Sequence, residues 1–449
     1  GEERGSFPNF DRDDDDDDDP YANIQALQKR SAKTIARFLG PGKKADVPII
    51  VPRYYGDLLS WALQRYIEAE GWKAVNTLCY SRSAARYTDV NTDYDRYESV
   101  LCDGRLLLQK EGKCLLATIN ATSIRPASLV MTTSSSATDE AHQFAEGVHN
   151  IAKEHNFYKG KKLGFSHRIS FLKPSSKNWQ DLALAPSLKD EIAANTAGFL
   201  SRRDELARYG IPARRGVLLV GEPGTGKTLI CKILMNNSTG ITCILATGSD
   251  LLDSRYLFEL YELAQDLRPS MVFIEDIDLI GEGRTESHYS RGGALATLLS
   301  ALDGVEECTE VVTVATTNWL EILDKALRNR PSRFDRVILL SLPSFEQRRE
   351  LVQSLSQTIP IDEDIQDYLA RRTGNYTPAQ VQEVVYSLVI EHKHSAHCDE
   401  LGYCKFDIEE VDNALSKVNG NGRRLEALYE FDTKGLIRLP GGKEIEGEH

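Results

Sequence analysis

The residues best suited to chemistry lie in one glycine-rich segment, Gly221 to Thr228, which has the spacing G-x-x-x-x-G-K-T. An apolar run at 217–220 precedes it and another at 229–234 follows, so a buried strand, a loop and a helix are predicted in that order. In such a loop the glycines let backbone N–H groups surround phosphate oxygens, and the following helix N-terminus favours negative charge. Lys227 can reach the β- and γ-phosphates, while the Thr228 hydroxyl can ligate Mg²⁺. The segment therefore predicts a site for ATP or GTP with magnesium.

Two acidic residues, Glu275 and Asp276, end the next apolar run at 271–274. Acids at the carboxyl end of a buried strand lie where α/β sheets bind their ligands. One carboxylate can hold Mg²⁺ and the other can orient the attacking water. We expect Glu275, together with Thr228, at the metal and Asp276 at the water. A solvated acidic turn is the alternative interpretation.

Further polar residues follow a third apolar run at 311–317. Asn318, which directly follows this run, carries an amide that can position the attacking water. A dense group of arginines comes next, including Arg330 and Arg333. A guanidinium is planar and permanently charged, which suits it to the γ-phosphate in its transition state. A solvated end of a helix would explain the same arginines.

Taken together, these segments resemble the AAA ATPase family. The glycine-rich loop, the acidic strand end, the asparagine and the pattern at 323–335 occur in the family's order. The resemblance covers about residues 166–415. It implies that Arg330 and Arg333 are arginine fingers acting on the nucleotide of a neighbouring subunit, which requires a ring, by resemblance a hexamer. It also implies that Asp181 and Ala183 belong to a segment flanking the adenine. The residues expected to bind the cofactors ATP and Mg²⁺ are Asp181, Ala183, Gly221, Glu222, Pro223, Gly224, Thr225, Gly226, Lys227, Thr228 and Leu229.

The chain departs from the family pattern at two places. The family ends its acidic strand with Asp-Glu, whereas this chain has Glu275-Asp276, so the water-polarising position carries a side chain one methylene shorter. Peptide-threading members have an aromatic–aliphatic–glycine pore loop, which the segment 252–258 lacks. We expect Tyr256 on a helix, packing inward, rather than facing a pore. These features, with the segment preceding the loop, resemble the Bcs-type branch of the family.

The expected fold class is α/β: a P-loop AAA+ parallel-sheet domain with a small helical lid, preceded by an α+β N-terminal domain. In the N-terminal part, helix periodicity alternates with short strand-like runs, and Asp103-Gly104 and Glu111-Gly112 are typical of hairpin turns. The expected segments are a disordered acidic tail at 1–20, an α+β substrate or adaptor domain at 21–165, the large ATPase domain at 166–342, the helical lid at 343–418 and a C-terminal tail at 419–449.

Charge and composition limit the classes of function. Residues 1–20 carry ten acidic side chains and two arginines, so the remaining chain holds about −5 of the total charge of −13. That balance gives no electrostatic footprint for nucleic acid. The sequence contains no apolar run of 18 residues, and the eight cysteines are scattered, so we expect no membrane span and a cytoplasmic protein with reduced thiols.

Metal chemistry other than magnesium has weak support. The histidines and cysteines between His392 and Cys404 do not have a zinc-site spacing, and an exposed helix end is the better interpretation. The metalloprotease signature H-E-x-x-H does not occur in this sequence.

Three functions remain. The leading one is an ATP-hydrolysing ring protein, chaperone-like, that remodels or translocates a protein partner without gripping it through an aromatic pore loop. The partner, an unknown substrate or adaptor, would be contacted by the N-terminal domain. The second is an ATP-gated oligomeric scaffold with negligible hydrolysis, and the third is a DNA-associated AAA+ loader.

Overall fold

The computed structural model describes residues 20–78, 85–122, 125–166, 168–251, 253–279, 309–318, 334–359, 361–391 and 405–428. The chain divides into two compact units, residues 1–157 and residues 158–449. This division lies before the expected boundary at 165/166, because residues 162–165 form a strand in the sheet of the second unit. Residues 1–19 of the expected acidic tail lie outside the described residues, whereas Pro20 is the first residue of a helix. No helix in the described part is both long and apolar enough to cross a bilayer.

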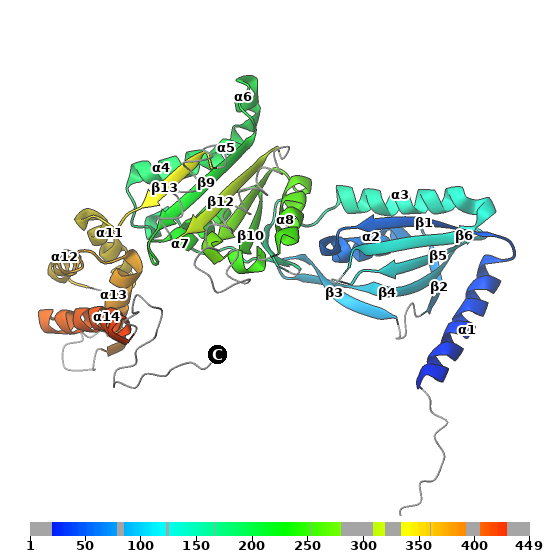
Figure 1. The fold of residues 1–449 in the computed structure, drawn as a ribbon, viewed down its shortest axis with the longest axis horizontal. Coiled ribbons are helices and arrows are strands. Elements are labelled where there is room, and N and C mark those ends of the chain that lie inside the picture. The colour runs from blue at the N-terminus through cyan, green and yellow to red at the C-terminus, as the bar shows by residue number, and fades with distance from the viewer. Residues whose placement is uncertain are drawn as a thin grey trace, which may run out of the picture. The chain divides into compact units, whose positions relative to one another are not determined.

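The first unit is built on an antiparallel sheet with the order β1-β6-β5-β4-β2, with β3 pairing to β4 (Figure 1). The turn between β4 and β5 is the predicted hairpin: Glu111 and Gly112 both have positive φ, as a two-residue turn of this kind requires. The predicted turn at Asp103-Gly104 is wrong, because both residues lie inside β4. Glycine at 104 avoids a tight fit there, because an added Cβ would meet Leu101 and Ala85 at 3.1 and 3.2 Å. The strands are β1 (Lys44–Val51), β2 (Lys73–Leu78), β3 (Arg86–Asp93), β4 (Arg96–Lys110), β5 (Lys113–Asn120) and β6 (Ala127–Ser134).

Helices cover both faces of this sheet. Leu106 and Leu108 of β4 pack with α2 (Gly56–Ala69) and α3 (Thr138–Glu154), whereas Leu107 packs with α1 (Pro20–Leu39). Alternate residues of a strand point to opposite faces, so α1 lies across the sheet from α2 and α3. Two short turns complete the unit, η1 (Arg53–Tyr55) and η2 (Ser135–Ala137).

The second unit contains a sheet with the order β13-β9-β12-β11-β10-β7-β8. All neighbouring strands are parallel except β8, which forms an antiparallel hairpin with β7. The apolar runs seen in the sequence are therefore central strands buried on both faces, as a parallel sheet requires. The strands are β7 (Lys162–Phe165), β8 (Ile169–Phe171), β9 (Arg214–Gly221), β10 (Thr242–Thr247), β11 (Ser270–Glu275), β12 (Val311–Thr317) and β13 (Arg336–Leu340).

Helices lie on both faces of this sheet as well. Val312 and Val314 of β12 belong to the core formed with α4, α5 and α7, whereas the hydroxyl of the intervening Thr313 pairs with Tyr261 of α8 on the opposite face. The described helices and helical turns around the sheet are η3 (Trp179–Asp181), α4 (Pro186–Asn195), α5 (Ala197–Ser201), α6 (Arg203–Arg208), α7 (Lys227–Asn236), η4 (Gly248–Leu251), α8 (Ser254–Asp266) and η5 (Ile277–Leu279).

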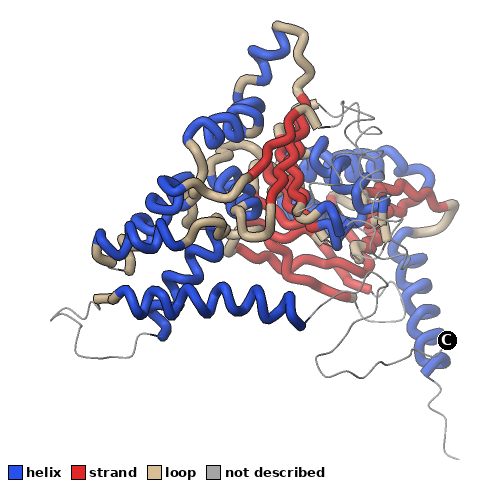
Figure 2. The backbone as a smooth tube through the Cα atoms, turned by 60° about the vertical axis from the view of Figure 1, so that its left-hand side comes forward, coloured by secondary structure: helices blue, strands red, loops and turns tan. Residues whose placement is uncertain are grey.

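The last part of the second unit is helical, as Figure 2 shows. Its helices are α11 (Phe345–Leu355), α12 (Glu363–Arg372), α13 (Pro378–Glu391) and α14 (Ile408–Leu428), which share one apolar core. The helix α14 continues beyond the expected lid end at 418, through four asparagine and glycine residues at 419–422 that disfavour a helix. The predicted fold class is confirmed: a parallel α/β sheet with a small helical part, preceded by an α+β domain.

Candidate nucleotide-binding site

The glycine-rich segment connects the end of β9 to the start of α7, as the sequence predicts. Gly224 and Gly226 have φ values of +84° and +100°, in the region that side chains with a Cβ disfavour. A Cβ added to Gly226 would also lie 2.9 Å from the end of the Leu182 side chain, which would have to move. The loop therefore depends on glycine at both positions for its backbone path.

Lys227 is the charged side chain inside this loop and is only 7% exposed. Its ammonium donates hydrogen bonds to the carbonyls of Gly221 (2.7 Å) and Glu222 (2.9 Å). Burial lowers the pKa of Lys227, while the nearby carboxylates of Asp276 and Asp278 oppose that shift. The carbonyls of the loop and the acids that follow β11 thus hold the Lys227 ammonium where it can bind a phosphate.

The remaining loop residues divide into a buried anchor and an open edge. Thr225 is buried, and its hydroxyl donates to the Glu222 carbonyl at 2.8 Å. Glu222, Pro223, Gly224 and Thr228 are exposed. The exposed edge and the first turn of α7, where backbone N–H groups lack helical partners, form an arrangement that can bind an anion.

Glu275 lies at the end of β11 and accepts a hydrogen bond from the Thr228 hydroxyl. Burial raises the pKa of Glu275, and the neighbouring Asp276 raises it further, whereas the Thr228 hydrogen bond and Lys232 lower it. The structure thus brings together Thr228 and Glu275, which the sequence predicts as metal ligands. A hydroxyl and a carboxylate are oxygen donors of the kind that Mg²⁺ prefers, so the residues fit that ion.

Asp276 begins a tight turn after β11 with φ of +52°. Its backbone N–H donates to the hydroxyl of Thr316 on β12 at 3.0 Å. Asp278 accepts a hydrogen bond from the hydroxyl of Thr317 at 2.9 Å. Asn318 follows Thr317 directly and is half-buried. The acids and the amide therefore project from the carboxyl ends of the neighbouring strands β11 and β12.

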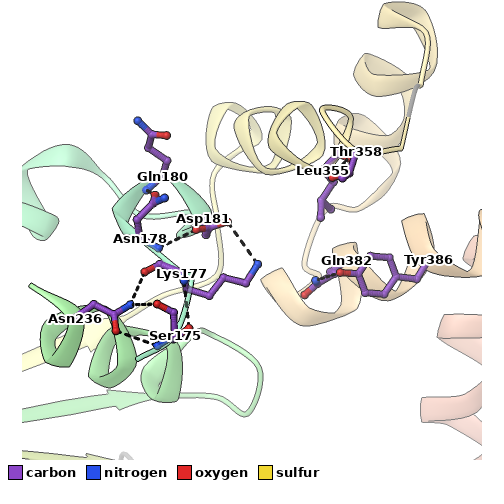
Figure 3. A network of polar contacts seen from close by, with 10 residues as sticks. All are labelled: Ser175, Lys177, Asn178, Gln180, Asp181, Asn236, Leu355, Thr358, Gln382 and Tyr386. Atoms are coloured by element: carbon purple, nitrogen blue, oxygen red, sulfur yellow. Dashed lines mark hydrogen bonds and ion pairs between the residues drawn. The ribbon is translucent and has the colours of Figure 1, made fainter. Parts of the chain in front are cut away.

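The segment containing Asp181 and Ala183 is fastened to α7 (Figure 3). Asn236, the last residue of α7, accepts a hydrogen bond from the Ser175 N–H and donates to the carbonyls of Ser175 and Lys177. The Asp181 carboxylate caps η3, where it accepts from the Asn178 N–H at 2.8 Å, and pairs with Lys177 at 3.5 Å.

The neighbouring residues of that segment lie closer to the loop. The buried Leu182 side chain lies beside Gly226. Ala183, the next residue, is also buried. The structure therefore places this segment along the glycine-rich loop, while both oxygens of Asp181 are engaged within η3 and its ion pair.

The helical part contacts the loop through the start of α13. The Ala379 N–H donates to the Gly224 carbonyl at 3.2 Å, and a Cβ added to Gly224 would lie 2.9 Å from the Thr377 hydroxyl. Thr377 and Gln380 cap this helix through reciprocal hydrogen bonds. The first turn of α13 contains no basic residue, so its contact with the loop is made by small and neutral groups.

Several predicted residues are not at the site that the structure describes. Arg330 and Arg333 lie outside the described residues, as does the histidine and cysteine cluster at 392–404. Within the described part of the chain, no group of three or more metal-binding side chains was found. Tyr256 lies in the first turn of α8 and is half-buried.

The sequence pattern does not single out Thr316, Thr317 or Gly248, although all three adjoin the acids. The available signal was the run of polar residues that ends the apolar strand β12. The register between β11 and β12 decides which acid each threonine hydroxyl contacts. A local sequence pattern does not specify that register.

Comparison with known proteins relates this part of the chain to AAA ATPases. Residues 217–342 match the model of the family described as "ATPase family associated with various cellular activities (AAA)". The chain is 35% identical over 221 residues to the ATP-dependent zinc metalloprotease FtsH 2 of Sphaerobacter thermophilus, covering 47% of this chain and 33% of the relative. It is 38% identical over 176 residues to the proteasome-activating nucleotidase of Methanospirillum hungatei, covering 37% and 42%. It is 30% identical over 294 residues to FtsH 3 of a Synechocystis species, covering 63% and 45%. The chain thus spans less than half the length of each of these relatives.

Proposed function

We propose that this chain, whose residues 217–342 match the AAA ATPase family model, binds ATP with Mg²⁺, hydrolyses the nucleotide and uses the energy to act on a protein partner. The observation that carries the proposal is the convergence of Lys227, Thr228, Glu275 and Asp276 beyond the carboxyl ends of β9 and β11, the two strands that flank β12. A buried ammonium, a hydroxyl paired with a carboxylate, and a second carboxylate are the groups that phosphoryl transfer to water requires.

Each residue has a distinct task in this proposal. Lys227 exchanges its carbonyl partners for the β- and γ-phosphate oxygens, where a charge-assisted hydrogen bond is stronger. Thr228 and Glu275 would hold Mg²⁺, which neutralises charge on the phosphates when bound. Asp276 accepts a hydrogen bond from the attacking water and orients it in line, and the Asn318 amide positions the same water.

We propose that Arg330 and Arg333 act on the nucleotide of a neighbouring subunit. Asp335, two residues after Arg333, accepts a hydrogen bond from the N–H of Gly216 at 2.7 Å. Gly216 lies five residues before Gly221, and at about 3.3 Å per residue that separation is roughly 16 Å. The position of Asp335 supports a finger that reaches a second copy of the chain rather than its own loop. A closed ring, for which we propose six subunits, gives every subunit such a neighbour.

The proposed partner is a protein. The relatives are named as proteases or as an activator of a proteasome, which supports protein-directed work by this domain. We propose that the N-terminal α+β unit contacts the substrate or an adaptor. The position of Tyr256 within α8 supports a mechanism in which no aromatic pore loop grips an extended chain. The four cysteines described are free thiols, which supports a reducing compartment such as the cytoplasm.

One observation favours a second candidate, a scaffold that assembles with ATP and hydrolyses it negligibly. Asp276 stands where the family has glutamate, and a displacement of about 1 Å can reduce a rate about a hundredfold. The two functions differ in their rate of phosphate release at saturating ATP.

Mixing two inactive variants tests the shared site. An Arg333→Ala chain retains its loop and a Lys227→Ala chain retains its finger, so mixed rings contain some complete interfaces. We expect the mixture to recover part of the wild-type ATPase activity, and wild-type specific activity to rise with protein concentration. A mixture no more active than its components, with wild-type activity unchanged on dilution to a demonstrated monomer, would contradict the ring.

A further inference from the structure

The turn that carries Asp276 has a left-handed backbone, which aspartate adopts more often than most residues with a Cβ but still uncommonly. Its φ of +52° lies in the left-handed region, which residues other than glycine rarely adopt. Such a conformation persists only where the surrounding structure holds it. Two residues from neighbouring elements contact the backbone of Asp276, one on each side.

The first is Thr316 of β12, which is only 1% exposed. The ladder between β11 and β12 is regular up to the pair Ile274 and Ala315. One residue later the chain of β11 turns, and the Thr316 hydroxyl accepts the hydrogen bond from the Asp276 N–H at 3.0 Å. A side chain thus replaces the backbone acceptor at the point where the ladder ends.

The second is Gly248, the first residue of η4 after β10. A Cβ added to Gly248 would lie 2.2 Å from the carbonyl oxygen of Asp276, a distance that real Cβ atoms do not show. The missing side chain allows η4 to pack directly on the peptide that follows Asp276. Gly248 has no positive φ, so its requirement for glycine comes from this contact rather than from its own backbone.

We propose that Thr316 and Gly248 are positioning residues that set the direction of the Asp276 carboxylate toward the attacking water. This inference rests on the proposed role of Asp276 in hydrolysis. Asp276 is one methylene shorter than glutamate, so its reach depends on where its backbone is held. Neither Thr316 nor Gly248 contacts the nucleotide in this account; both act through the Asp276 backbone. Their loss should therefore lower kcat while leaving the affinity for ATP unchanged.

Thr313 provides a matched control on the same strand. It is 6% exposed, and its hydroxyl pairs with the Tyr261 hydroxyl at 2.8 Å on the opposite face of the sheet. Replacing it with valine removes a buried side-chain hydrogen bond, as Thr316→Val does, but three residues earlier on β12 and without touching the Asp276 backbone. Any general effect of a weakened β12 appears in both variants.

The experiment measures steady-state phosphate release, ATP affinity by calorimetry and thermal unfolding for Thr316→Val, Thr316→Ser, Gly248→Ala and Thr313→Val. We expect Thr316→Val and Gly248→Ala to lower kcat by about tenfold to a hundredfold, with ATP affinity within about twofold of wild type. Thr316→Ser retains the acceptor and should recover most of kcat. Thr313→Val should lose stability but keep kcat.

Two results would overturn the inference: a kcat for Thr316→Val equal to that of Thr313→Val, or a loss of ATP affinity as large as the loss of kcat. An Asp276→Asn variant in the same series distinguishes a failure of the positioning role from a failure of the proposed role of Asp276. If Asp276→Asn abolishes turnover and Thr316→Val does not reduce it, only the positioning role fails. If Asp276→Asn turns over at the wild-type rate, the proposed role of Asp276 fails, and the positioning role fails with it.

Discussion

Replacing Gly224 with alanine perturbs the nucleotide loop in a way whose size the structure defines. Gly224 has φ of +84°, and a left-handed backbone costs a residue with a Cβ roughly 1–2 kcal/mol. The new Cβ would also lie 2.9 Å from the Thr377 hydroxyl and 3.0 Å from the Ala379 side chain, so the loop or the start of α13 must move. If the loop leaves its phosphate-binding path to relieve this strain, ATP binding must restore that path.

The expected loss of ATP affinity follows from the same free energy. A cost of about 1–2 kcal/mol corresponds to about 5- to 30-fold in the dissociation constant. Gly240→Ala is the matched control, because Gly240 has φ of +73° with no heavy atom within 4 Å of an added Cβ. It lies between α7 and β10, away from the loop. Gly240→Ala keeps its strain in the folded protein, so it should lose free energy of unfolding without losing affinity. Gly224→Ala should lose affinity but less free energy of unfolding, because its loop relaxes when no nucleotide is bound.

Calorimetric titration with ATP and Mg²⁺, together with chemical unfolding, measures both quantities. Equal ATP affinity in Gly224→Ala and Gly240→Ala would refute the reasoning, because the backbone path at Gly224 would then have no part in binding. An equal loss in both variants would also refute it, since the loss would then reflect stability alone.

Three further predictions concern charged groups at the site. Lys227→Ala should weaken ATP binding by about 10- to 150-fold in calorimetry, because hydrogen bonds to charged groups contribute about 1.5–3 kcal/mol; unchanged affinity in the folded variant would remove the loop from the site. Glu275→Gln should raise the free energy of unfolding of the metal-free protein at pH 7, because burial raises the pKa of Glu275 in the fold and its ionised form is a cost there. That advantage over wild type should shrink as the pH falls through the raised pKa of Glu275, and it should vanish below the ordinary value for glutamate, where the folded and unfolded states are both protonated. An advantage independent of pH, or none at pH 7, would contradict the assignment. Arg333→Ala should lower kcat by about 10³-fold with little change in ATP affinity, as expected for a group that acts only in the transition state; an equal loss of affinity would indicate a ground-state contact.

The sequence predicts the parts of this molecule that depend on local patterns. The strand, loop and helix around Gly221 to Thr228 follow from an apolar run, two glycines at fixed spacing and a second apolar run. The helices of the C-terminal part follow from their periodicity, and the hairpin at Glu111-Gly112 follows from its turn residues. These features need no knowledge of the tertiary contacts.

Other features depend on contacts between distant segments. Asp103-Gly104 has the composition of a hairpin turn, but a close approach of Leu101 and Ala85 explains its glycine within β4. The Thr316 hydroxyl meets the Asp276 N–H only because β11 and β12 are neighbours, and the sequence alone does not state their register. The capping role of the Asp181 carboxylate depends on Asn178 and on the approach of Lys177, which the adenine-flanking motif does not indicate. Arg330, Arg333 and the acidic tail lie outside the described residues, so the expectations for them remain predictions.

The central claim is that the acids after β11 make this chain a working ATPase. Steady-state phosphate release from the wild type and from Asp276→Asn, each with ATP affinity measured in parallel, tests it most directly. The account predicts turnover by the wild type that saturates with ATP, and an Asp276→Asn variant that binds ATP with similar affinity but releases phosphate at least about a hundredfold more slowly. Phosphate release from Asp276→Asn at the wild-type rate, or its absence from the assembled wild-type protein, would contradict the account.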